Sequence, residues 1–129
     1  MTESEWMEQF EAGTLGNNAF HHADHVRMAF LYLRHYPALE AMSRFSSALK
    51  RFAANNGKPA LYNETITWGY LLLIRDRIAR TAETSTWEEF AAANEDLLHR
   101  GNSILKKFYR PETLNSELAK RVFLFPDNI

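Results

Sequence analysis

The sequence predicts an all-α protein, a single-domain up-and-down helical bundle over residues 1–129 with about five main helices and short helical pieces near the C-terminus. Three observations support this fold class. Apolar residues recur at helical spacing almost throughout, and no segment alternates convincingly as a strand does. At 46% apolar and 13% aromatic residues, the chain has the side chains to fill a core. A length of 129 residues suits one domain.

Apolar stripes and boundary signals define the predicted helices. The main helices cover approximately residues 4–11, 22–36, 38–55, 64–80 and 87–98, and shorter pieces follow at about 104–109, 116–122 and 123–126. Gly13 ends the first helix, and Pro37 separates the second from the third. Asn63 is a favourable N-cap for the fourth helix, and Thr86 opens a capping-box pattern before the fifth. The second helix is apolar over so much of its surface that we expect it at the centre.

Composition and charge argue against several classes of function. Without cysteine, the chain cannot form disulfides or cysteine-based metal and iron–sulfur sites. A formal net charge of −1 gives no field to attract nucleic acid or an anionic membrane. No apolar run approaches the roughly 20 residues that span a bilayer, and the acidic N-terminus lacks the features of a signal peptide. We therefore expect a cytoplasmic protein without nucleic-acid or membrane partners.

Three histidines within five residues, His21, His22 and His25, are the most informative feature of the sequence. They lie at the start of the second predicted helix, and imidazole binds divalent metals and changes charge near neutral pH. On a helix, His22 and His25 lie about 60° apart around the axis, so their rings can share one ion. His21 and His25, about 40° apart, form an alternative pair. The positive end of the helix dipole favours neutral imidazole, which is the form that binds metal.

Topology adds a carboxylate to this site. Consecutive helices joined by short loops run antiparallel, so the second and fourth helices begin at one end of the bundle, where the fifth helix ends. This places Glu64 at the level of His22 and His25, and it brings His99 to the same end, whereas His35 lies at the other end. We predict a site of His22, His25 and Glu64 for zinc, iron, manganese or nickel. Two histidines and a carboxylate leave coordination positions for water or substrate.

Some of these residues also have structural interpretations. Glu64 suits a helix start and His99 a helix end, because their charges complement the helix dipole. Asp24 is expected to cap the helix or to pair with Arg27, or to accept a hydrogen bond from a histidine ligand of the metal. A charged group in the fourth helix is typical of a solvated face: Arg75, Asp76, Arg77 and Arg80. A smaller basic group, interleaved with aromatic residues, fits an anion or a phosphate: Lys106, Lys107 and Arg110.

Four segments carry a pattern that spans most of the chain after residue 20. They are His22–Leu33, Tyr62–Thr67, Phe108–Pro111 and Phe125–Asp127. The pattern resembles a family of small, uncharacterised bacterial proteins that are all-helical, with a His-x-x-His helix start and a Tyr-x-Glu-Thr motif. The resemblance implies that one functional unit contains His22, His25, Tyr62, Glu64 and Thr65, and it carries no established activity. In these relatives a histidine often stands where this chain has Asn63.

Two other helical families bind metals through histidine. The HD phosphohydrolases need a His-Asp dyad, and here the order is Asp24-His25, which argues against them. The DinB-like bundles use a His-x-x-x-His helix, a spacing that His21 and His25 share. That spacing falls on an early helix with no strong third histidine after it, so this family is a minor alternative.

Two hypotheses of function follow. In the first, the chain binds a divalent metal ion. If it is an enzyme, we expect a metal-dependent hydrolase or lyase that acts on a small molecule. Glu64 and Tyr62 are then the candidate catalytic residues, and whether the protein is an enzyme is left open. In the second, it is a metal-free module that binds a small molecule or another protein. A monomer and a homodimer fit the sequence equally well.

Overall fold

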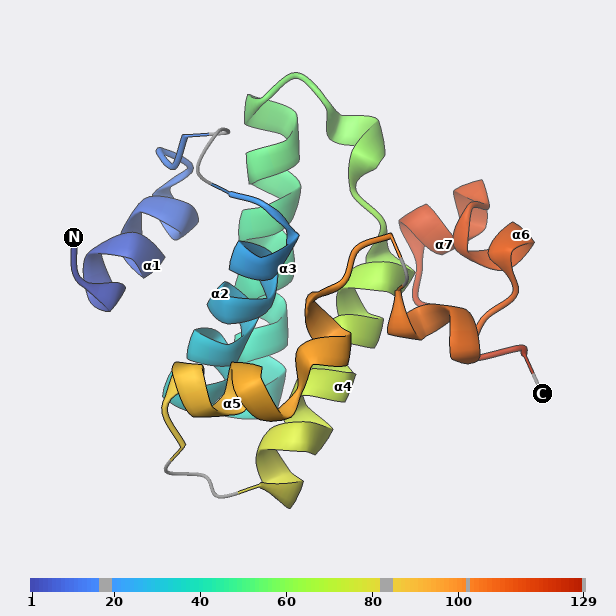
Figure 1. The fold of residues 1–129 in the computed structure, drawn as a ribbon. Helices are drawn as coiled ribbons and strands as arrows, with labels where there is room; N and C mark the ends of the chain where they lie inside the picture. The colour runs from blue at the N-terminus through green and yellow to red at the C-terminus, as the bar shows by residue number, and fades with distance from the viewer. Residues whose placement is uncertain (17–19, 82–84, 102, 129) are drawn as a thin grey trace. The chain divides into compact units, whose positions relative to one another are not determined.

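The computed structural model describes residues 1–16, 20–81, 85–101 and 103–128 (Figure 1). The predicted all-α class is confirmed: 71% of the chain is helical, and the described part contains no strand. Within that part, no helix combines the length and the apolar character needed to cross a membrane. The chain divides into two compact units, Met1–Tyr62 and Asn63–Ile129. The prediction that residues 1–129 form one domain stays a prediction.

The first unit contains three of the predicted main helices and one 3-10 turn: α1 (Glu3–Ala12), α2 (His22–His35), α3 (Ala38–Asn55) and η2 (Pro59–Leu61). Each main helix lies within one or two residues of its predicted range. Gly13 ends α1 with a φ of 78°, a left-handed conformation that favours glycine. Pro37 directly precedes α3, where its fixed φ suits the helix entry and its missing N–H costs no hydrogen bond.

The core of the first unit is an aromatic cluster centred on Phe10, which is fully buried. Its ring centroid lies 5.1 Å from that of Phe20, 6.0 Å from that of Tyr32 and 5.4 Å from that of Phe45. These partners come from the segment before α2, from α2 and from α3, so a single side chain of α1 packs against all three. Aromatic pairs at such distances add about 0.5–1.5 kcal/mol each to the stabilisation from burial.

The second unit contains α4 (Glu64–Arg80) and a series of short helices. These are α5 (Trp87–Ala93), η3 (Glu95–Leu98), η4 (Ile104–Lys107), α6 (Pro111–Leu114) and α7 (Glu117–Arg121). The N-cap of α4 is confirmed, because Asn63 Oδ1 accepts a hydrogen bond from the Ile66 N–H at 2.9 Å. The capping box before α5 is also confirmed: the Glu89 N–H donates to Thr86 Oγ1 at 3.2 Å, and the Thr86 N–H donates to Glu89 at 3.1 Å.

The C-terminal half of this unit packs on α4. Its buried cluster is formed by Leu105, Tyr109 and Leu114, with Ile66, Tyr70 and Leu73 of α4 against it. Gly69 permits the approach of η4, because a Cβ atom at that position would lie 3.0 Å from Cδ2 of Leu105. A small residue on α4 therefore lets the leucine side chain lie close to the helix backbone.

The fifth predicted helix is shorter than expected. We predicted it through about Leu98, whereas α5 ends at Ala93 and a separate 3-10 turn, η3, follows Asn94. Asn94 ends the helix because its side-chain amide donates to the carbonyl of Phe90 at 2.9 Å, which caps the final turn. His99 therefore follows η3 and is not the last residue of a long helix, which corrects the prediction that placed it there.

Candidate functional site

The start of α2 holds the histidine cluster as an ordered helical turn. His21 is the N-cap residue, and its backbone N–H donates to Oδ2 of Asp24 at 2.9 Å. The expected capping role of Asp24 is therefore confirmed. Arg27 instead pairs with Glu3 of α1, with 3.5 Å between Arg27 Nη2 and Glu3 Oε2. Because Asp24 accepts from the backbone of the cap, His22 and His25 lie on a turn whose geometry is fixed locally.

His25 is anchored to the aromatic core of the first unit. Its ring centroid lies 4.2 Å from that of Phe20, with 33° between the ring planes. Phe20 is buried and also contacts Phe10 and Phe52, each with a centroid distance of 5.1 Å. A metal binds an imidazole nitrogen in the plane of the ring, so a ring that stacks through its face still offers its edge to an ion. His25 is thus held by packing, and His22, three residues earlier, is half-buried on the same turn.

The other predicted site residues are divided between the two units. Tyr62 ends the first unit and is buried, and Nζ of Lys50 lies 5.1 Å from the centre of its ring. Glu64 is the first residue of α4 in the second unit and is half-buried. Among the described residues, no three His, Cys, Asp or Glu side chains form a group that could hold a metal ion. The ligand set of His22, His25 and Glu64, with Tyr62 beside it, stays a prediction.

The start of α4 is joined to the C-terminal segment by buried hydrogen bonds. The side-chain amide of Asn63 donates to the carbonyl of Leu114 at 2.8 Å. Thr65, fully buried, donates from Oγ1 to the carbonyl of Val122 at 2.8 Å and accepts from the Leu124 N–H at 3.1 Å. Asn63 and Thr65 therefore have structural roles that explain these residue types without a ligand.

Further hydrogen bonds fix the C-terminal segment at Leu124 and Asp127. The hydroxyl of Tyr109 donates to the carbonyl of Leu124 at 2.6 Å. Asp127 accepts from the Arg110 N–H at 2.9 Å and from the hydroxyl of Thr113. These hydrogen bonds, from Thr113 first and then from the Arg110 N–H, hold the pKa of Asp127 below its usual value. The motif segments Phe108–Pro111 and Phe125–Asp127 are thus bonded to each other through Arg110 and Asp127. The Tyr62–Thr67 segment bonds instead to Leu114, Val122 and Leu124.

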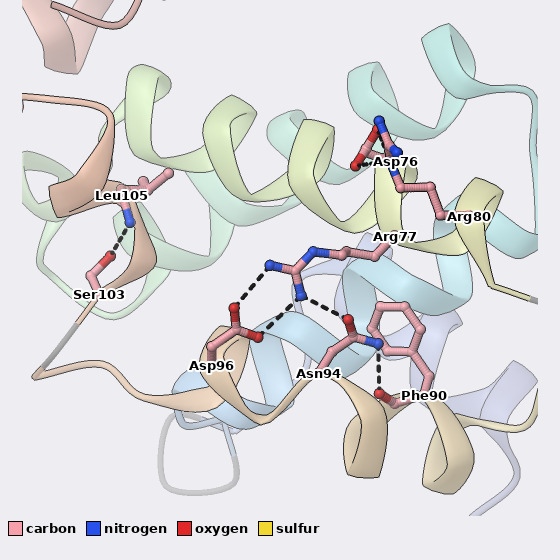
Figure 2. A network of polar contacts seen from close by, with 8 residues as sticks. All are labelled: Asp76, Arg77, Arg80, Phe90, Asn94, Asp96, Ser103 and Leu105. Atoms are coloured by element: carbon pink, nitrogen blue, oxygen red, sulfur yellow. Dashed lines mark hydrogen bonds and ion pairs between the residues drawn. The ribbon is translucent and has the colours of Figure 1, made fainter. Parts of the chain in front are cut away.

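A polar network that the sequence did not predict joins α4 to η3 (Figure 2). Arg77 donates to Oδ1 of Asn94 at 2.7 Å and forms a two-point pair with Asp96, at 3.1 and 2.8 Å. The guanidinium hydrogen bonds lower the pKa of the Asp96 carboxyl, and Arg77 in turn has a raised pKa. We expected Arg77 to lie on a solvated face. That expectation does hold for Arg80, which is exposed and pairs with Asp76 along the same helix.

The fold and these residues define a small all-α protein. One unit has a histidine pair at the start of a helix, and in the other unit hydrogen bonds fix the C-terminal segment to the rest of the unit. Comparison with protein-family models, with curated proteins and with solved structures gave no significant match. The resemblance to small helical proteins with a His-x-x-His helix start stays a prediction.

Proposed function

We propose that this protein binds a divalent transition-metal ion through His22 and His25 at the start of α2. The observation that carries the proposal is the placement of two imidazoles one turn apart on a helix whose first turn is capped by Asp24. The stacking of His25 on Phe20 supports it, because an already fixed ligand loses less conformational freedom when the ion binds. Metal binding requires neutral imidazole, so the occupancy of the site should rise with pH.

Glu64 and Tyr62 enter the proposal from the sequence alone. Glu64 supplies the carboxylate that a catalytic His-His-carboxylate site uses, and Tyr62 supplies a hydroxyl donor. A bound ion would activate water or polarise a carbonyl or phosphoryl oxygen. A hydrolase or lyase acting on a small molecule is the enzyme class that follows from it.

Elemental mass spectrometry on tag-free protein tests the proposal after incubation with zinc, manganese, iron(II) or nickel. We expect about one equivalent of metal per chain in the wild type and its loss in His22→Ala and in His25→Ala. His35→Ala is the matched control, because His35 lies at the other end of α2 with Nδ1 2.9 Å from the Leu31 carbonyl oxygen. Glu64→Gln tests the carboxylate by removing its charge while keeping its size.

Folding and binding are separated by circular dichroism on the same samples. A His25→Ala variant that stays helical and retains metal would contradict the proposal, and so would wild-type protein that binds none of the four ions. The second result would favour the metal-free binding module, in which the histidines serve packing and hydrogen bonding. Thermal melting with and without chelator gives an independent readout, because a bound ion stabilises the folded state by mass action.

A further inference from the structure

The second unit contains a pocket of about 200 Å³ with charged residues in its wall, distinct from the histidine cluster. Its walls come from η3, from η4 and from residues between them: Asp96, His99, Ser103, Ile104, Lys106 and Lys107. Ile104 is buried and supplies the apolar part of the wall, whereas His99 and both lysines are exposed. A ligand in solution can therefore reach the charged groups of the pocket directly.

The charge balance of the pocket is positive. The carboxylate of Asp96 is already engaged through both of its oxygens by the Arg77 guanidinium. With Arg77 included, three cationic groups accompany one carboxylate at the pocket, and Lys107 lies near enough to Asp96 to contribute, after Arg77, to the lowering of its pKa. Asp96 therefore does not neutralise both lysines, and an anion is the ligand whose charge this wall complements.

Hydrogen-bond donors accompany the charges. Lys106 Nζ donates to the Gly101 carbonyl at 3.0 Å, which uses one of the three N–H bonds of the ammonium and positions the group beside the pocket. Ser103 Oγ accepts from the Leu105 N–H at 3.2 Å and lies 2.8 Å from the hydroxyl oxygen of Tyr70. Either hydroxyl can be the donor in this pair, and the arrangement in which Tyr70 donates is the one that suits an anion. The hydroxyl proton of Ser103 then remains to be donated to a ligand.

We propose that this pocket binds the phosphoryl group of a small phosphorylated molecule, with Lys106 and Lys107 as cationic contacts and Ser103 as a hydroxyl donor. A phosphoryl dianion offers two charges and several acceptor oxygens, which match two ammonium groups and a hydroxyl better than a single carboxylate does. Pockets for drug-sized ligands are about 300–1,000 Å³, so this smaller pocket suits a phosphoryl group with a short substituent. The formal net charge of −1 disfavours nucleic acid as the source of the phosphate.

An NMR titration of the full chain tests the proposal at pH 7.5 and constant ionic strength, with chelator present so that the result is independent of metal binding. The probes are inorganic phosphate and glycerol 3-phosphate, with chloride and sulfate as comparison anions. We expect saturable shifts of the backbone amides of Asp96, His99 and Ser103–Lys107 with both phosphates, and weaker shifts with sulfate. Tighter binding of glycerol 3-phosphate identifies a monoester as the ligand, and tighter binding of inorganic phosphate identifies the free ion.

Matched variants locate the site. Lys106→Gln and Lys107→Gln should each weaken phosphate binding about tenfold, because each removes one charge-assisted contact. Lys120→Gln should leave it unchanged, since Lys120 is a lysine of the same unit that pairs with Glu117 outside the pocket. Three results would overturn the proposal: no saturable shift, equal shifts with chloride, or unchanged affinity in the double variant at both lysines. Tighter binding of a short single-stranded oligonucleotide than of glycerol 3-phosphate would also overturn it, in favour of a nucleic-acid surface.

Discussion

The hydroxyl of Thr65 provides the sharpest test of how the second unit is held together. It is fully buried at the start of α4, donates to the carbonyl of Val122 and accepts from the Leu124 N–H. Thr65→Val keeps the shape and volume of the side chain and removes both hydrogen bonds. Thr65→Ser is the matched control, because it removes a methyl group and keeps the hydroxyl.

The expected magnitude follows from these two bonds. Each neutral hydrogen bond contributes about 1 kcal/mol net, and a buried backbone group that loses its partner costs about 1–3 kcal/mol. Val122 is 44% exposed and Leu124 is half-buried, so water can replace part of what the valine variant loses. We therefore expect the lower end of that range, about 2 kcal/mol for the pair. The equilibrium constant for opening of the C-terminal segment should then be about 30-fold larger in the valine variant.

Native-state amide hydrogen exchange measures this opening directly at the Leu124 N–H. Thr65→Val should accelerate its exchange about 30-fold, whereas Thr65→Ser should leave it near the wild-type rate. Phe123, in the same C-terminal segment as Leu124, stacks on Trp68 of α4 with 5.6 Å between ring centroids. Opening of the segment should therefore also change the fluorescence of Trp68. Unchanged protection of Leu124 in the valine variant would refute the reasoning. Equal acceleration in both variants would show that the methyl group contributes as much as the hydroxyl.

Two further predictions concern the same unit. Asn63→Ala should lower the free energy of unfolding by about 3 kcal/mol in urea titrations, because it removes an N-cap worth about 1 kcal/mol and leaves the Leu114 carbonyl without its donor. Asn63→Ser should cost less, since its hydroxyl keeps a capping oxygen, and an equal loss would contradict this account. The pKa of Asp127 lies below its usual value of 3.8, so its ionised form favours the folded state. The stability from this carboxylate should be complete above pH 3.8 and should fall as the pH drops through the folded-state pKa; Asp127→Asn should flatten that acid limb of a pH–stability curve.

The helices could be predicted because their boundary signals lie next to them in the sequence. Pro37, Asn63 and Thr86 each act on backbone groups within a few residues, so a local pattern contains the whole interaction. The range predicted for α4 agrees with the structure for this reason. The range predicted for α3 does as well, since a proline precedes it and a turn sequence follows it.

The interruption of the fifth helix could not be predicted, because the Asn94 side chain that caps it at Phe90 is also bound by a residue elsewhere in the chain. Apolar spacing continues past Asn94 to Leu97, which is buried, so the periodic signal gives no sign of an end. Asn94 is oriented by Arg77, a residue 17 positions earlier on α4 (Figure 2). A charge pattern shows that α4 has three arginines, but it does not show which of them turns toward η3. The charge pattern therefore predicts a solvated face for all three arginines.

The residues of the sequence motifs are tested by two different kinds of variant. Asn63 and Thr65 satisfy buried backbone groups across more than fifty residues of sequence, so their place in the Tyr62–Thr67 motif follows from folding alone. At the start of α2 the capping comes from Asp24 and the backbone of His21, and His25 stacks on Phe20. Stacking on Phe20 would be served as well by another aromatic ring at position 25. The His22 and His25 variants therefore test the proposed metal site, whereas the Asn63 and Thr65 variants test folding.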